Sequence, residues 1–271
     1  MAINDSSHYE EGMEEFMNRG IKDVITEHPE LEAILDDYDI GCGACMVGTC
    51  LLKDIVDVHG LPSETERALM GRITKVIYPN AEIETSEDDG KAQAERTFAY
   101  SPPVQILVDE HKLIKRLIAL IPCIMESMDL TNEDGRQLVL DGVDFIKTYA
   151  DSFHHAKEED LLFKYFDEDS EIVSAFHEDH RVARNHVKNI LEGVSEKNRA
   201  KVAEHLGAYN ELLQVHIKRE DEILYPWMDR NISSEQETEL AASFDEVADR
   251  FGDVNERYEV FVQRLEKSFL D

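Results

Sequence analysis

The chain has 271 residues and a formal net charge of −31, from 59 acidic and 28 basic side chains. Nucleic acids and anionic membranes are bound by clustered Lys and Arg, so this charge argues against both as partners. The sequence has no apolar run of about 18 residues, and its polar N-terminus is unlike a signal peptide. We therefore expect no membrane span, a cytoplasmic location and, from the length, two domains.

Residues 1–80 are predicted to form a small helical domain. Pro29 suits the start of one helix, where its missing N–H costs nothing. Apolar residues at helical spacing predict a second helix that begins near Cys45 and ends before Gly60. Residues 81–102 are polar, acidic and aperiodic, as in a linker between domains.

Three cysteines in this domain indicate redox or metal chemistry. Cys42 and Cys45 form a Cys-x-x-Cys pair before the predicted helix, whose dipole favours a thiolate. One interpretation makes these two residues a catalytic dithiol that cycles with a disulfide. The other is an iron–sulfur cluster bound by Cys42, Cys45 and Cys50, with a fourth ligand from Cys123, a histidine or a second chain. Inert buried thiols are the third possibility.

Residues 103–232 are predicted to form a four-helix bundle, because four consecutive segments repeat apolar residues at helical spacing. In each segment a histidine interrupts the apolar stripe, and two of the histidines are followed one turn later by a glutamate. These polar residues are His111, His154, Glu158, His180, His216 and Glu220.

These six side chains together predict a metal site. A single histidine on an apolar face is usually a core residue, but two buried glutamates cost several kcal/mol each unless paired, protonated or bound to metal. No Lys or Arg lies on the stripes. Imidazole and carboxylate suit iron, manganese, zinc or copper, and six ligands exceed what one tetrahedral ion needs. The set favours a carboxylate-bridged dinuclear site with open positions.

The motifs around these residues resemble the hemerythrin-like HHE cation-binding family. They are HHAKEEDLLF from His154, HIKREDEILYP from His216, and the triplets that end at His111 and His180. Within the family, the set of four His and two Glu is similar to di-iron proteins that repair iron centres under nitrosative and oxidative stress. The resemblance covers residues 104–230.

The resemblance implies two oxo-bridged, non-haem irons and an all-α, hemerythrin-like four-helix bundle. Glu158 and Glu220 would bridge the irons, with two histidines on each. We assign His111 and His154 to one iron, and His180 and His216 to the other. It also implies that dioxygen, nitric oxide or peroxide binds there. Residues 17–78 are similar to the small redox-disulfide domain that accompanies such proteins.

The predicted bundle repeats internally. HHAKEEDLLF aligns with HIKREDEILY, and DEHKLIKRLI aligns with EDHRVARNHV, which predicts two helical hairpins related by duplication. Oxygen-carrying hemerythrins have a further histidine one turn from the third-helix ligand, where this chain has Phe176 and Arg184. We therefore do not expect a five-histidine site, which favours reactivity over reversible carriage. The other histidines of the bundle are expected at the surface or behind the ligands: His155, His177, His186 and His205.

Residues 233–271 are predicted to form a long C-terminal helix. Ser233 and Gln236 match a capping box, and apolar residues then follow a heptad pattern for more than three repeats. Two interpretations stay open, a fifth helix packed on the bundle and the seam of a homodimer.

The resulting functional hypothesis is a di-iron stress protein that reacts with nitric oxide or oxygen species, or donates iron for repair of iron–sulfur proteins. Catalytic reduction of nitric oxide or peroxide would need an electron donor, with Cys42 and Cys45 passing electrons. An electron donor or an iron–sulfur client protein would be its partner. The alternative is a sensor or carrier of dioxygen or iron whose N-terminal domain binds a partner. A third reading is a structural metal bundle without redox chemistry.

Overall fold

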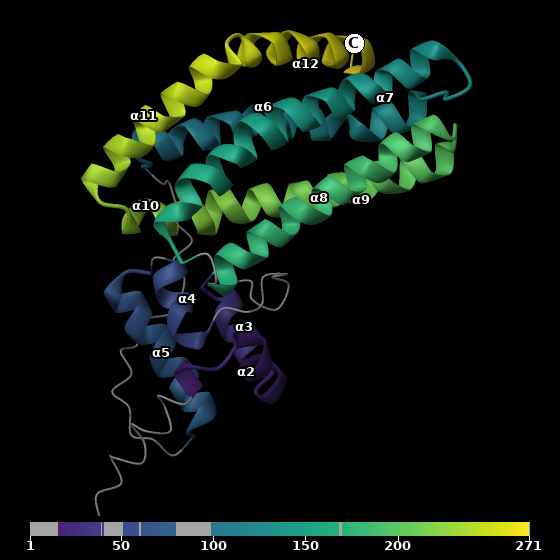
Figure 1. Ribbon diagram of the computed structural model, residues 1–271. Coiled ribbons are helices and arrows are strands. Elements are labelled where there is room, and N and C mark those ends of the chain that lie inside the picture. The colour runs from purple at the N-terminus through teal and green to yellow at the C-terminus, as the bar shows by residue number, and fades with distance from the viewer. Residues whose placement is uncertain are drawn as a thin grey trace, which may run out of the picture. The chain divides into compact units, whose positions relative to one another are not determined.

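The computed structural model describes residues 16–38, 40, 51–59, 61–79, 99–167 and 170–270. The chain divides into two compact units, Met1–Ala99 and Tyr100–Asp271 (Figure 1). The described residues are helical except for turns and one isolated antiparallel bridge between Gly20 and Leu51. The predicted all-α fold is therefore confirmed.

The described part of the first unit packs short helices around an apolar core. They are α2 (Ile21–Glu27), α3 (Glu30–Asp36), α4 (Leu52–His59) and α5 (Ser63–Ile77). Pro29 directly precedes α3 as its N-cap, as predicted. The helix predicted to begin near Cys45 begins instead at Leu52, after the bridge at Leu51, and its last described residue is His59. The core is made by side chains from all four helices, including Val24, Leu31, Leu52 and Leu69.

Cys42, Cys45 and Cys50 lie outside the described residues. The dithiol and the iron–sulfur cluster are thus both still predictions. Cys123, which belongs to the second unit, is a half-buried free thiol.

The second unit is built on four long helical arms that lie side by side (Figure 1). The first arm is α6 (Pro102–Ser127). The second runs through α7 (Glu133–Phe145), η1 (Ile146–His155), η2 (Glu158–Leu162) and η3 (Phe163–Tyr165). The third is α8 (Glu171–Ser195), and the fourth runs through α9 (Arg199–Arg219), η4 (Glu220–Leu224) and α10 (Tyr225–Asn231). In η1, η2 and η4 the backbone is π-helical, whereas η3 is a short 3₁₀ turn.

Local sequence explains where these arms begin. Pro102 occupies the first position of α6, where its fixed φ suits a helix. The side chains of Asn132 and Asn198 cap α7 and α9 by accepting backbone N–H bonds. Pro122 lies inside α6 and does not end it, since the helix continues to Ser127.

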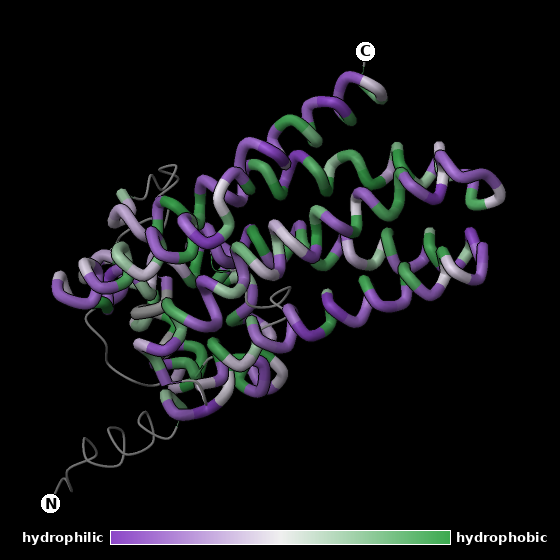
Figure 2. Tube along the Cα trace, turned by 45° about the horizontal axis from the view of Figure 1, so that its top comes forward, coloured by the Kyte–Doolittle hydropathy of each residue, from purple (hydrophilic) through white to green (hydrophobic). Residues whose placement is uncertain are grey.

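Apolar residues of all four arms meet in one core, and hydrophobic and hydrophilic residues alternate along each helix (Figure 2). Leu117, Phe153, Ile190 and Leu213 are examples with at most 1% of their surface exposed. Burial of this core is the main driving force for assembling the arms. Among the described residues, no helix is both long and apolar enough to span a lipid bilayer.

The C-terminal segment forms two helices instead of the single long one predicted. They are α11 (Ser234–Phe251) and α12 (Val254–Leu270), separated at Gly252, whose φ of +60° favours glycine. The predicted capping box of Ser233 and Gln236 is present.

Both C-terminal helices pack on the bundle of their own chain, against α6 and the second arm (Figure 1). Heptad residues such as Phe244, Tyr258 and Leu265 are buried there. Arg116 of α6 donates hydrogen bonds to Glu259 and Glu266 of α12 from different edges of its guanidinium, at 2.7–2.8 Å. The heptad positions thus pack on the bundle of the same chain, as in the packed-helix interpretation. The dimer seam stays a prediction.

Candidate metal centre

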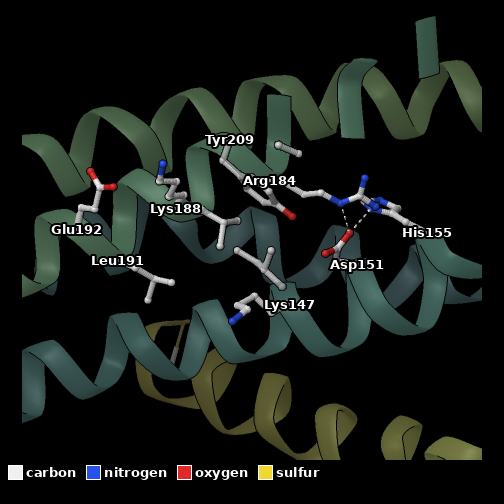
Figure 3. Close-up of a pocket in the computed structure, with 11 residues that line it drawn as sticks. Lys147, Asp151, His155, Arg184, Lys188, Leu191, Glu192 and Tyr209 are labelled. Carbon is white, nitrogen blue, oxygen red and sulfur yellow. Dashed lines mark hydrogen bonds and ion pairs between the residues drawn. The ribbon is translucent and has the colours of Figure 1, made fainter. Parts of the chain in front are cut away.

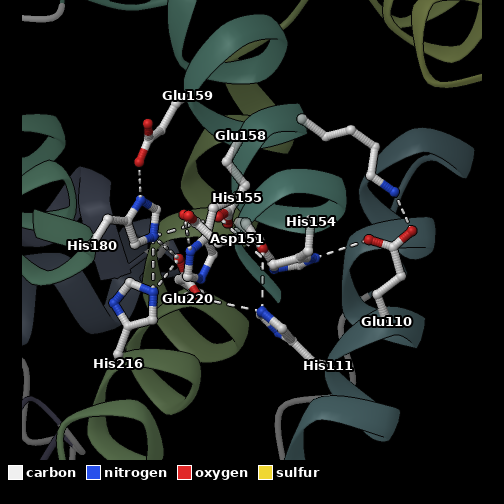
Figure 4. A network of polar contacts seen from close by, with 12 residues as sticks. Glu110, His111, Asp151, His154, His155, Glu158, Glu159, His180, His216 and Glu220 are labelled. Carbon is white, nitrogen blue, oxygen red and sulfur yellow. Dashed lines mark hydrogen bonds and ion pairs between the residues drawn. The ribbon is translucent and has the colours of Figure 1, made fainter. Parts of the chain in front are cut away.

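The six predicted ligand residues meet in the interior of the bundle (Figure 4). Each is at most 1% exposed, and they come from all four arms. The donor atoms of His111, His154, Glu158 and Glu220 lie within 4.8 Å of one another. The arms thus bring together residues that are more than 100 positions apart in the sequence.

Glu220 lies between the two pairs of histidines. Its Oε1 atom is 3.0 Å from His216 Nε2, and its Oε2 atom is 3.2 Å from His111 Nε2. Glu158 is placed similarly, with Oε2 3.5 Å from His180 Nε2 and 3.8 Å from His154 Nε2. Both carboxylates therefore face histidines of both pairs.

The imidazole spacing also fits a metal. The Nε2 atoms of His180 and His216 are 3.1 Å apart. Two imidazoles at right angles on one ion, with bonds of about 2.1 Å, have nitrogens about 3 Å apart. A pair held this closely is suited to share one ion.

Several inward-facing atoms of the site make no hydrogen bond. His154 Nε2, Glu158 Oε2 and both carboxylate oxygens of Glu220 are among the buried atoms without one. No Lys or Arg within the described part of the chain pairs with either glutamate. Because such orphaned atoms cost free energy, the residues fit a site built for cations.

The pKa values of the two buried glutamates are shifted in opposite directions. Burial and the neighbouring Glu220 carboxylate raise the pKa of Glu158 well above its usual value. Burial acts on Glu220 in the same direction, but His216, His111 and His180 outweigh it and hold its pKa well below normal. Two carboxyl groups thus share one buried site and ionise unequally, and positive charge between them would relieve the repulsion.

Behind the ligands lies a ring of carboxylates. Each of the four histidines turns its Nδ1 atom to one carboxylate. The pairs are His111 with Asp221 (2.7 Å), His154 with Glu110 (2.9 Å), His180 with Glu159 (2.6 Å) and His216 with Asp179 (3.1 Å). This bond keeps the proton on Nδ1 and leaves the Nε2 lone pair facing the interior, as a metal ligand requires.

Each of these carboxylates is in turn paired with a basic side chain. The pairs are Asp221 with Lys115, Glu110 with Lys157, Glu159 with Arg184 and Asp179 with Arg219. These cations compensate the outer carboxylates and leave the two inner glutamates uncompensated. Sequence reasoning missed this ring, although every member is adjacent to a ligand: Glu110, Asp179, Glu159 and Asp221.

The ring follows the internal repeat of the sequence. In the alignment of the two halves, Glu110 matches Asp179, Glu159 matches Asp221, and their cations match in the same way. Each carboxylate binds the histidine of the next arm around the bundle. The predicted duplication thus agrees with the spatial arrangement of the polar residues.

One residue of the site was not expected there. His155 was predicted to lie at the surface or behind the ligands, but it is 4% exposed and its ring stacks on His180 with centroids 3.9 Å apart. The reason is the π-helical backbone of η1, whose turn holds more residues than an α-helical turn. Neighbouring side chains are then rotated by a smaller angle, so His154 and His155 both face inward. The surface interpretation was wrong.

Aromatic rings cover the two ends of the site differently. Tyr225 stacks on His111, and its hydroxyl group donates to Glu158 Oε1 at 2.5 Å. Phe163 matches Tyr225 in the repeat and lies parallel to His180, with centroids 6.4 Å apart. A hydroxyl group is therefore present at one end and absent at the other.

A cavity of about 360 Å³ reaches the site at His155 (Figure 3). It lies between η1 and α8, with Tyr209 of α9 in its wall. Ile146, Val187 and Leu191 make its lining largely apolar. Its size falls within the range of small-molecule pockets.

The remaining histidines of the bundle do not join the cluster. His177 contacts the edge of Phe163, and His186 and His205 face each other with Nδ1 atoms 3.0 Å apart. Their prediction as residues outside the ligand set is consistent with these contacts.

Comparison with known proteins agrees with this geometry. The model of the hemerythrin HHE cation binding domain matches residues 102–228, and again residues 171–267. The second match begins at the start of α8, as expected if the second hairpin repeats the first. Neither the curated proteins nor the solved structures gave a match. Since the two matches together cover more than half of the chain, this protein belongs to the hemerythrin HHE cation-binding family.

Proposed function

We propose that the bundle holds a carboxylate-bridged pair of irons and reacts with nitric oxide, dioxygen or peroxide. His111 and His154 would bind one iron, His180 and His216 the other, and Glu158 and Glu220 would bridge them. The observation that carries this proposal is the pair of buried glutamates without a cation, each facing histidines of both pairs. A single ion would leave half of these donors without a partner.

Iron held there would supply redox equivalents and open coordination positions for small ligands. The protein would supply the rest. The outer carboxylates hold each imidazole in one tautomer, and burial excludes bulk water from the reacting centre. The buried Tyr225 hydroxyl group, which donates to Glu158, would be a proton donor on its side of the site.

The cavity beside His155 is the proposed path by which small ligands enter. It is apolar enough for nitric oxide or dioxygen, and His155 in its wall stacks on His180. Arg184, in the wall of the cavity, forms ion pairs with Asp151 and Glu159. Changes in the cavity should thus alter ligand access without removing a ligand residue.

We further propose a role in nitrosative or oxidative stress, either by reducing these species or by donating iron to damaged iron–sulfur proteins. Cys42 and Cys45 would pass electrons to the site, and an electron donor or client protein would be the partner. The same metal site would serve a sensor, but a sensor needs no turnover.

Anaerobic assays of the iron-loaded full chain test this function. Excess nitric oxide or peroxide is supplied with an artificial reductant, and consumption is followed over time. Consumption of many equivalents per chain supports catalysis. Consumption that stops at one or two equivalents contradicts it and favours a sensor or carrier. Transfer of iron to an apo iron–sulfur protein would identify the repair role.

A further inference from the structure

We infer that His155 is a seventh ligand of the centre, which gives one metal three imidazoles and the other metal two. The inference rests on the proposed dinuclear site and deepens it. It makes the two metal positions chemically different, although the polypeptide around them is duplicated.

The first observation is the position of the ring. A ring nitrogen of His155 lies within 4.8 Å of the donor nitrogens of both His180 and His216. The three side chains are all buried, and Figure 4 shows the rings gathered around Glu220. Donors on opposite sides of one ion, with bonds of about 2.1 Å, lie about 4 Å apart, so small rotations would suffice to bring all three to one ion.

The second observation is the surroundings of its other nitrogen. His155 Nδ1 faces Asp151 Oδ1 at 3.7 Å, and Asp151 pairs with Arg184 at 2.7 Å (Figure 3). The order of histidine, carboxylate and cation is the same as behind the four predicted ligand histidines, whose Nδ1 atoms lie closer to their carboxylates, at 2.6–3.1 Å. A histidine that only filled space would not need this arrangement. The arrangement is what orients an imidazole ligand.

The third observation is that this position breaks the repeat. The two halves match at both ligands, at the outer carboxylates and at their cations, but Ile217 stands where His155 is expected to have its counterpart. Ile217 is 1% exposed and lies in an α-helical segment. The first half of the repeat therefore has both an imidazole and a π-helical backbone at this position, and the second half has neither.

The test replaces iron with Co²⁺ and counts the ligated histidines by proton NMR. Each imidazole bound through Nε2 carries an exchangeable Nδ1 proton with a strongly shifted resonance. We expect five such resonances in the wild-type chain. In His155→Phe, which keeps a ring against His180 without the nitrogens, we expect four, and cobalt binding at the His111 side should persist.

His177→Phe is the matched control, because His177 lies near the site but outside the cluster. It should leave all five resonances. Four resonances in the wild type, or an unchanged count in His155→Phe, would overturn the assignment. The wild-type count decides the question even if the variant fails to fold.

The outcome separates this inference from the proposed function. Two cobalt ions per chain with four resonances would contradict the role of His155 and preserve the dinuclear site. Uptake of one cobalt would contradict the dinuclear site. In that case the His155→Phe variant still tests the inference. It loses one shifted resonance if His155 binds the ion, and none if it does not.

Discussion

His216 Nδ1 lies 3.1 Å from Asp179 Oδ2, and Asp179 directly precedes His180 in the sequence. One short segment thus contains one predicted ligand residue, His180, and orients a second one, His216, on another arm. Asp179 also pairs with the buried Arg219, which fixes its carboxylate. The two halves of the second hairpin are coupled through this contact.

The first prediction follows from that coupling. Asp179→Asn should weaken metal binding by about 10- to 100-fold, because a neutral amide is a weaker acceptor for His216 Nδ1 than the carboxylate. Competition with a chelator measures the change in affinity. Glu178→Gln is the control, since Glu178 is exposed and pairs only locally with Arg181. Equal affinities in the two variants would show that the outer carboxylate has no orienting role.

The second prediction concerns the bridge. Glu220→Ala should lose both metals, because this carboxylate faces His216 with one oxygen and His111 with the other. Glu158→Ala should behave in the same way. Metal content after gel filtration measures the effect, with Glu222→Ala as an exposed control on the same turn. Loss of one metal with retention of the other would refute the bridging assignment.

The ligand set could be predicted because its residues follow α-helical spacing on apolar stripes. His155 was not predicted to face inward, because an α-helical period turns its side chain outward, whereas the backbone of η1 is π-helical. The adjacent histidines in HHAKEE were the available signal. The carboxylates were also readable in principle, because Glu110 and Asp179 stand at equivalent places in the repeat.

The C-terminal helices show a different limit of the sequence. A heptad pattern identifies the apolar face of a helix but not the surface that covers it. Here α6 and η1 of the same chain contact α12, and Arg116 reinforces the contact through two glutamates. The positions of Tyr258 and its neighbours were thus predictable, whereas their partner was not.

The third prediction tests that packing. Tyr258 is 3% exposed, stacks edge-on against Phe145 and donates a hydrogen bond to Asp144. Tyr258→Ala should therefore lower the free energy of unfolding by about 3–5 kcal/mol. Val260→Ala, on the exposed face of α12, should change it by less than about 0.5 kcal/mol. Urea unfolding measures both, and similar midpoints would mean that α12 does not stabilise the bundle.

The fourth prediction concerns entry of ligands. Leu191 lines the cavity and is only partly buried, so Leu191→Trp should narrow the cavity without disturbing the ligands. Stopped-flow binding of nitric oxide should become several-fold slower, with unchanged metal content. Val215→Trp, at an exposed position of α9, should bind at the wild-type rate. If both variants bind equally fast, ligands use another path.

The fifth prediction concerns the cysteines. Cys42→Ser or Cys45→Ser should slow reductant-driven turnover, because these thiols are proposed to pass electrons to the centre. Metal content should not change, since the proposed iron ligands all lie in the second unit. Turnover at the wild-type rate with a physiological donor would remove the electron-transfer role and favour partner binding.

The most direct test of the dinuclear centre is iron analysis of the anaerobically reconstituted chain, combined with Mössbauer spectroscopy. We predict two irons per chain in one magnetically coupled pair, because Glu158 and Glu220 face both groups of histidines. A single iron per chain, or two irons without magnetic coupling, would contradict the carboxylate-bridged centre.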